Sequence, residues 1–221
     1  MTIPIFITAR TGSTRLPRKH FLDLGGISVI EHMVRRCEHF GFKPYLCVPK
    51  GDWIEFNDHA TTIDIFGGDP DNVEARLIEC AHSTGHDIFH QLDGDDPFFS
   101  RECVIESMQC FRMGKFSRIL PPVASQAGAA LCGTSYNLKA PKDYTVETLP
   151  DPSHQVWPQR MTLDYEEDYH LLCAVNRMVG GYMAPREAVD QLFERNPDLH
   201  KVNWFRTAEW KERQRHERSS Q

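Results

Sequence analysis

Four basic side chains gather in a loop near the start of the chain. The stretch ARTGSTRLPRK, residues 9–19, follows the apolar run IPIFIT and carries Arg10, Arg15, Arg18 and Lys19. Backbone N–H groups of such a loop can bind an anion, and arginine and lysine can hold phosphate oxygens. The loop lacks G-K-[ST] and is therefore not a Walker A motif. A solvated basic loop is the alternative, but its position directly after a buried strand favours phosphate binding.

A second group of candidate residues is acidic. Asp93, Asp95 and Asp96 follow the apolar run IFHQL within QLDGDDPFFS, residues 91–100. Carboxylates this close together repel one another unless a cation neutralises them. Carboxylates, water and substrate phosphates are the ligands that Mg²⁺ prefers. A turn with solvated acids explains the same pattern equally well from the sequence alone.

Two further stretches carry candidate residues. Asp164 ends the run RMTLD, residues 160–164, before a helical pattern, so it can cap that helix or act as a second metal ligand facing Asp95. Gly67 and Gly68 allow close approach of the backbone to a ligand, and Arg76 lies at the start of the next helix. For this stretch the alternative is a turn, a capped helix and a solvent-facing Arg76.

Apolar runs that alternate with helical patterns must position these groups. Strands are expected at residues 3–8, 44–48, 61–66, 88–92, 117–120 and 160–164. Helices are expected at residues 28–40, 71–85, 100–113, 166–179 and 185–196, with Asp71 as the cap of the second. The alternation predicts a three-layer α/β fold, in which helices cover both faces of a mostly parallel sheet. Ligands bind at the carboxyl ends of such strands, where the basic loop, the acidic cluster and Asp164 should meet.

The later part of the chain is less regular. Residues 121–160 are rich in proline, glycine, alanine and serine, which predicts a loop-rich excursion with one or two short antiparallel strands, such as residues 129–137. Residues 1–210 are expected to form a single domain that includes this excursion. The tail, residues 211–221, is charged and poor in apolar residues, and it is expected to be disordered.

Composition excludes several classes of function. The net charge of -6 over 221 residues argues against a general nucleic-acid binder. No apolar run approaches the roughly 20 residues that cross a bilayer, and the N-terminus lacks a signal-peptide layout, so a cytoplasmic protein is expected. The seven cysteines form no C-x-x-C pair and are expected to be buried free thiols. The eleven histidines indicate no metal site.

Taken in order, these segments resemble the cytidylyltransferase family that activates sugars for surface polysaccharides. The family includes the 3-deoxy-manno-octulosonate and acylneuraminate cytidylyltransferases and the spore-coat polysaccharide type. The resemblance is carried by ARTGSTRLPRK, GGDPDNVEAR, GDDPFF and RMTLDYEEDYHLL, and FERNPDLHKVN resembles the closing segment of the spore-coat type. The matches span most of residues 3–203.

The resemblance implies a Rossmann-like fold of the nucleotide-diphosphosugar transferase kind. It implies that Arg15, Lys19 and Asp95 have catalytic roles, that Asp95 and Asp164 bind Mg²⁺, and that Glu147 lies on the acceptor side. The residues implied to bind the nucleotide, with the backbone of the first at the base, are Ala9, Arg10, Thr11, Gly12, Ser13, Arg15, Lys19, Arg76 and Asp93.

The activity implied by the resemblance is transfer of CMP from CTP to a sugar acid or a related acceptor, with release of pyrophosphate. A nucleotidyltransferase using another nucleotide and a non-catalytic nucleotide or sugar-phosphate binder are the alternatives, while an RNA-binding protein is disfavoured by the acidic net charge. Two departures stand out. Arg18 stands where the family often has glycine, and the segment after Glu147 is short. The short segment leaves the acceptor and the family's homodimer open.

Overall fold

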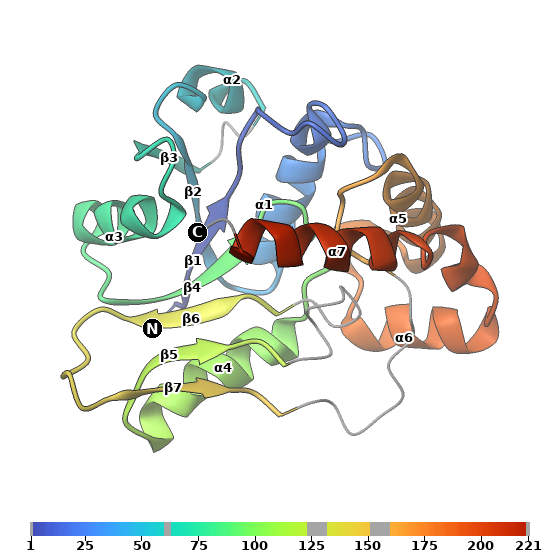
Figure 1. Ribbon diagram of the computed structural model, residues 1–221. Coiled ribbons are helices and arrows are strands. Elements are labelled where there is room, and N and C mark those ends of the chain that lie inside the picture. The colour runs from blue at the N-terminus through green and yellow to red at the C-terminus, as the bar shows by residue number, and fades with distance from the viewer. Residues whose placement is uncertain (1, 60–62, 123–131, 151–159, 220–221) are drawn as a thin grey trace.

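The computed structural model describes residues 2–59, 63–122, 132–150 and 160–219 (Figure 1). Within them, one seven-stranded sheet has the order β3-β2-β1-β4-β6-β5-β7. The strands are β1 (Pro4–Thr8), β2 (Lys43–Pro49), β3 (Asp64–Gly68), β4 (Ile88–Asp93), β5 (Phe116–Leu120), β6 (Thr134–Asn137) and β7 (Thr145–Thr148). Strands β3, β2, β1 and β4 are parallel, whereas β6 is antiparallel to both β4 and β5. The predicted mostly parallel sheet is thus confirmed.

Helices cover both faces of this sheet, as predicted. They are α1 (Val29–His39), α2 (Trp53–Asn57), α3 (Val73–Thr84), α4 (Arg101–Met113), α5 (Glu166–Val179), α6 (Arg186–Arg195) and α7 (Arg206–Ser219), with the short 3-10 helices η1 (Lys19–Phe21), η3 (Gly181–Met183) and η4 (Leu199–Val202). Alternate residues of β1 pack against the helices on opposite faces of the sheet. Ile5 and Ile7 pack in the core formed with α1, α5 and α6. Phe6 packs with Leu77 of α3 on the other face, because successive side chains of a strand point to opposite sides.

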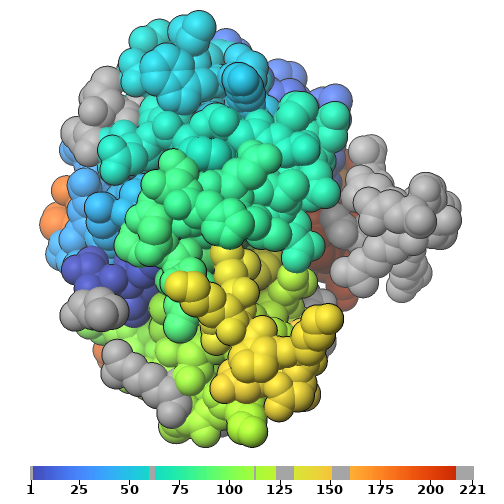
Figure 2. All heavy atoms as spheres, turned by 90° about the vertical axis from the view of Figure 1, so that its left-hand side faces the viewer, coloured from blue at the N-terminus to red at the C-terminus, as the bar shows by residue number. Residues whose placement is uncertain are grey.

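Figure 2 shows the side of the molecule on which β3 and α3 lie. Helix α2 lies above α3, and the segment around β6 and β7 lies below it. None of the helices in the described ranges is both long and apolar enough to cross a membrane.

Several predicted helix ends are confirmed. The Ser28 hydroxyl accepts a hydrogen bond from the Glu31 N–H and starts α1, and Gly85 ends α3 with φ of 72°. The cap of α3 is Asn72, not Asp71, since the Asn72 side chain accepts the hydrogen bond from Ala75 N. Helix α2 has no counterpart among the predicted elements.

The predicted strand at residues 160–164 is wrong. The segment makes one backbone hydrogen bond to the β4 side, from Leu163 N to Asp95 O at 2.8 Å. The N–H groups of Arg160 and Asp164 instead donate to side-chain oxygens of Asn203 and Asp168. Side chains therefore supply the partners that a neighbouring strand would otherwise provide.

The irregular region differs in part from its prediction. Strand β6 confirms an antiparallel strand within residues 129–137, of which residues 129–131 lie outside the described ranges. Strand β7, in contrast, pairs parallel with β5. Helix α7 extends into the charged tail and ends at Ser219. One tertiary contact at the start of this polar helix is the ion pair of Arg206 with Glu167 of α5, and Arg206 also pairs with Glu209 within α7.

The register of the sheet positions the site. Thr8, the last residue of β1, stands opposite Asp93, the last residue of β4. The basic loop and the acidic cluster therefore leave the sheet side by side, at the carboxyl ends of adjacent strands.

Candidate active site

A cavity of about 210 Å³ opens at the carboxyl ends of β1 and β4. The basic loop, the end of β4 and the start of α3 contribute its walls. It is lined by Thr8, Ala9, Arg10, Arg15, Lys19, His20, Pro70, Asp71, Val73, Arg76, Asp93 and Asp95. Four cationic side chains thus face the same space as three acidic side chains, which is an arrangement suited to a phosphorylated ligand and a cation.

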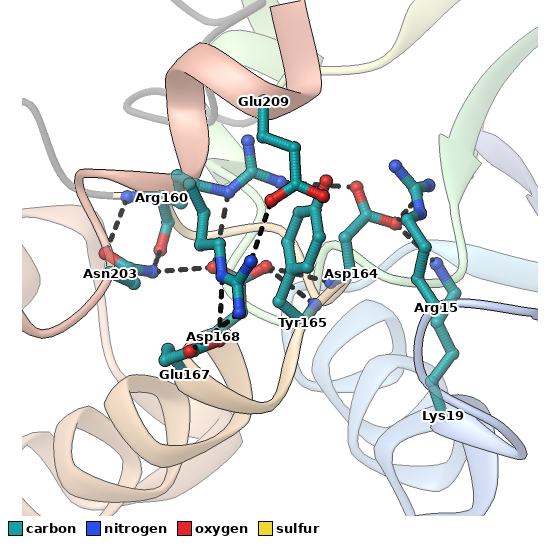
Figure 3. Close-up of polar contacts among 10 residues, drawn as sticks. Arg15, Lys19, Arg160, Asp164, Tyr165, Glu167, Asp168, Asn203 and Glu209 are labelled. Atoms are coloured by element: carbon teal, nitrogen blue, oxygen red, sulfur yellow. Dashed lines mark hydrogen bonds and ion pairs between the residues drawn. The ribbon is translucent and has the colours of Figure 1, made fainter. Parts of the chain in front are cut away.

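Lys19 lies at the centre of the site. Its Nζ lies 2.5 Å from Asp95 Oδ2 and 3.1 Å from Asp164 Oδ1, and Arg15 Nη2 lies 2.7 Å from the same Asp164 oxygen. Figure 3 shows Arg15 and Lys19 reaching Asp164 from one side. The structure therefore brings together the basic loop and both carboxylates that the sequence proposes as metal ligands, although 145 residues separate Lys19 from Asp164.

Burial and charge act in opposite directions on these groups. Burial alone would lower the pKa of Lys19, but the carboxylates of Asp95 and Asp164 raise it above its usual value. Burial would likewise raise the pKa of Asp95, yet the Lys19 ammonium lowers it. At neutral pH both groups are therefore charged, and each stabilises the other.

The other two acids of the cluster behave differently. Burial, and then the charge of Asp95, raise the pKa of Asp93 to about 6 and that of Asp96 well above its ordinary value. Asp93 still opens to the cavity, where its Oδ1 accepts hydrogen bonds from Thr8 Oγ1 at 3.0 Å and Gln91 Nε2 at 2.8 Å. Crowding of negative charge is the feature that a bound cation relieves.

These residues fit a hard divalent cation. One carboxylate oxygen from each of Asp93, Asp95 and Asp96 lies within 4.8 Å of the others. The Lys19 ammonium, a cation itself, already lies between Asp95 and Asp164. An all-oxygen set suits Mg²⁺ better than softer metals.

The remaining residues of the basic loop divide into two groups. Ala9 and Arg10 line the cavity, whereas Thr11, Gly12 and Ser13 are not among its lining residues. The Thr11 N–H donates to Asp52 Oδ2 at 2.7 Å, so α2 tethers this part of the loop. Its amide is consequently engaged by the protein in this conformation.

Arg18 points away from the cavity. It forms an ion pair with Glu55 of α2, and its guanidinium lies 5.1 Å from the centre of the Phe21 ring. Its φ of 56° lies in the left-handed region, which glycine adopts without strain. This conformation explains why a glycine suits the position, and the contact with Glu55 gives Arg18 a role in holding the loop.

Arg76 lines the cavity, as predicted, whereas Glu147 does not. The Arg76 Nε donates to Asp69 O at 2.9 Å, and this bond holds the segment that follows β3 against α3. Glu147 is exposed on β7, with β6 and β5 between that strand and β4. Glu147 therefore lies outside this cavity, and its acceptor-side role stays a prediction.

Two features of the site were missed from the sequence. His20 lines the cavity, and its Nδ1 lies 3.0 Å from Gly94 O. Arg160 contacts Asp164 from the side opposite to Lys19. The spacing of Arg160, Asp164 and Asp168 at intervals of four residues, each of them charged, was a signal available in the sequence.

Comparison with known proteins identifies the relatives of the chain. Residues 5–113 match the family model described as Cytidylyltransferase. The 3-deoxy-manno-octulosonate cytidylyltransferase of Nitrobacter winogradskyi is 32% identical over 127 residues, which cover 56% of this chain but only 46% of that enzyme. The spore coat polysaccharide biosynthesis protein SpsF of Bacillus subtilis is 26% identical over 235 residues, covering 89% of this chain and 95% of SpsF.

Solved structures show the same fold. A cytidylyltransferase from Leptospira borgpetersenii superimposes with a TM-score of 0.75 at 17% identity, over 90% of this chain and 97% of its own. A CMP:2-keto-3-deoxy-manno-octonic acid synthetase in complex with CTP has a TM-score of 0.58 at 17% identity, over 80% of this chain and 99% of its own. Together the matches confirm the resemblance and the fold expected from the sequence motifs.

Proposed function

We propose that this chain, whose residues 5–113 belong to the cytidylyltransferase family, transfers CMP from CTP to a sugar acid or a related acceptor and releases pyrophosphate. One observation carries the proposal: Lys19 joins the cavity-lining basic loop to Asp95 and Asp164, the two carboxylates suited to a cation. Surface polysaccharide synthesis and a cytoplasmic location are parts of the same proposal.

In this reaction an acceptor oxygen attacks the α-phosphorus of CTP, the bond to the β-phosphate oxygen breaks, and pyrophosphate leaves in line. The protein contributes by positioning the two reactants and by stabilising charge. Mg²⁺, held by Asp95 and Asp164, supplies further neutralisation of phosphate charge when it is bound.

The basic residues act on the phosphates. Arg10, Arg15 and Lys19 line the cavity and bind phosphate oxygens in the proposal. Arg15 offers the planar fork of its guanidinium, and Lys19 offers a compact charge close to the leaving pyrophosphate. Both also contact Asp164 Oδ1, so a phosphate competes with this carboxylate for their N–H groups.

The test is release of pyrophosphate with CTP and Mg²⁺ against a panel of sugar acids and sugar phosphates, with UTP, GTP and ATP as competing nucleotides. The Asp95→Asn variant, which keeps the side-chain volume, should lose about 10²–10³ in turnover, as other preorganised charge sites do. Near-normal turnover by a folded Asp95→Asn protein would contradict the assignment.

A non-catalytic nucleotide binder is the second candidate, and the position of Glu147 favours keeping it. That residue, expected on the acceptor side, lies on β7 and does not line the cavity. Thermal shift separates the two functions. A ligand at 100 times its dissociation constant stabilises a protein by about 2.7 kcal/mol. A shift with CTP but no pyrophosphate release with any acceptor supports the binder.

A further inference from the structure

We propose that Arg160 is a positioning residue for Asp164, and that Asp168 and Asn203 hold it in place. In this proposal Arg160 turns the Asp164 carboxylate so that Oδ1 alone faces the phosphate-binding loop. The proposal rests on the proposed function, since it takes Asp164 to be a ligand of the metal that accompanies the nucleotide.

Arg160 contacts two carboxylates from a fully buried position. Its side chain has 0% exposure, and its Nη2 lies 3.2 Å from Asp164 Oδ2 while its Nε lies 3.2 Å from Asp168 Oδ1. A planar guanidinium with two engaged edges has little rotational freedom. Arg160 thereby fixes the orientation of the Asp164 carboxylate from the side opposite to Lys19.

The two oxygens of Asp164 have different partners. Oδ2 is bound by Arg160, whereas Oδ1 accepts from Arg15 at 2.7 Å and from Lys19 at 3.1 Å. Figure 3 shows the carboxylate between these two groups. When Arg15 and Lys19 move to phosphate oxygens, Oδ1 becomes available to a cation while Arg160 keeps the carboxylate in place.

Asp168 also fixes the backbone of the proposed ligand. Its Oδ2 accepts hydrogen bonds from Asp164 N and Tyr165 N, both at 3.0 Å. Asp168 therefore holds the main chain at Asp164 through one oxygen and the Arg160 side chain through the other. Asp168 thus holds the backbone of Asp164 while Arg160 holds its carboxylate.

Asn203 connects this pair to the C-terminal part of the chain. Its Nδ2 donates to Arg160 O at 2.8 Å and to Asp168 Oδ1 at 2.9 Å, and its Oδ1 accepts from Arg160 N at 3.2 Å. The rings of Tyr165 and Trp210 lie 5.5 Å from the Arg160 guanidinium carbon, so α7 covers it. Asn203 and Trp210 do not line the cavity, but in this proposal they influence the orientation of Asp164 through Arg160.

A purely stabilising ion pair is the alternative explanation. Buried ion pairs often contribute little net stability, because desolvation offsets their attraction. Residues that orient a metal ligand through hydrogen bonds, in contrast, commonly change metal affinity about 10–100-fold when they are replaced. The two explanations therefore differ in whether metal binding is affected beyond the fold.

The test uses Arg160→Lys, which keeps the charge but cannot engage both carboxylates with a planar fork. Mn²⁺ serves as the probe. We expect the affinity for Mn²⁺ together with CTP to fall about 10–100-fold, while the affinity for CTP in EDTA changes less than threefold. Isothermal titration measures both, and the electron paramagnetic resonance spectrum of bound Mn²⁺ should change.

Arg206→Lys is the matched control. Arg206 also ties α7 to α5, through Glu167, but makes no contact with the Asp164 carboxylate. It should keep the wild-type affinity for Mn²⁺ with CTP.

Asp168→Asn is the second variant, in case Arg160→Lys does not fold, and should show the same selective loss. The inference is overturned if a folded variant of Arg160 or Asp168 binds Mn²⁺ with CTP as the wild type does. It is also overturned if CTP affinity in EDTA falls equally. If the wild type itself binds no Mn²⁺ with CTP, the proposed function fails first, and the inference fails with it.

Discussion

Lys19 and Asp95 form an ion pair between the basic loop and the acidic cluster, with Nζ 2.5 Å from Oδ2. The same ammonium lies 3.1 Å from Asp164. Lys19 therefore lies between the two proposed metal ligands. A metal held by Asp95 and Asp164 would compete with the Lys19 ammonium for these oxygens, so the proposed function implies an exchange in which Lys19 leaves them for a phosphate.

This exchange predicts an unusual effect of Lys19→Met. Removing the ammonium frees two carboxylates, so the affinity for Mn²⁺ alone should rise roughly tenfold, which corresponds to about 1.4 kcal/mol. The affinity for CTP should fall at the same time, because a phosphate partner is lost. Calorimetric titration with each ligand measures both changes. Lys43→Met, at the exposed start of β2, is the control. Unchanged or weaker binding of Mn²⁺ alone by Lys19→Met would refute the exchange.

Gly94→Ala should displace the acidic cluster, which consists of Asp93, Asp95 and Asp96. A Cβ at this position would lie 2.8 Å from Thr8 O and 3.0 Å from Ala9 Cβ, both close to the basic loop. Overpacking of this kind costs about 1–3 kcal/mol, and the shift should also separate Asp95 from Lys19. Urea denaturation and CTP binding should both show a loss. Gly51→Ala, where nothing lies within 4 Å, should leave both unchanged.

Buried histidines predict a loss of stability in mild acid. Burial lowers the pKa of His90 to about 3, and burial together with Arg36 lowers that of His32 to about 4. The unfolded chain binds these protons near pH 6.5 and the folded chain does not, so stability is full above pH 6.5 and falls as the pH drops toward 4. The slope is at most about 1.4 kcal/mol per pH unit for each histidine.

Urea denaturation between pH 7.5 and pH 4.5 measures this slope. His20 is a third buried histidine with its pKa lowered to about 4, so His90→Gln should make the dependence shallower by about a third. An unchanged slope in that variant would exclude His90 as a source of the effect.

Arg36 should be the most sensitive arginine of α1. It is fully buried and donates to Phe99 O, Tyr182 O and Ala184 O at 2.8 Å each. Arg36→Met leaves these three carbonyl oxygens without that donor and should cost about 3 kcal/mol or more in the free energy of unfolding. Arg35→Met removes an exposed pair with Glu31, which is worth about 0.3–0.5 kcal/mol. Equal losses in the two variants would contradict this assignment.

Local pattern was sufficient for much of the fold. The helix over residues 28–40 and its Ser28 cap, the buried strands at residues 3–8 and 88–92, and the end of α3 at Gly85 all depend on neighbouring residues, and the structure agrees with them. The strand expected at residues 160–164 is absent, because the backbone of Arg160 bonds to a partner that is distant in the chain, Asn203.

The sequence by itself determined the chemistry of the site: a basic loop after the first strand, carboxylates after β4 and Asp164 before a helix. Parallel strands bring their carboxyl ends to one edge, so the meeting of Lys19 and Asp95 followed from alternation alone. Only the tertiary structure decided which oxygen of Asp164 faces Arg15 and Lys19. That choice depends on Arg160, Asp168 and Asn203, whose contacts span up to 43 residues. Hydrogen-bond geometry between such residues has no signature in local composition.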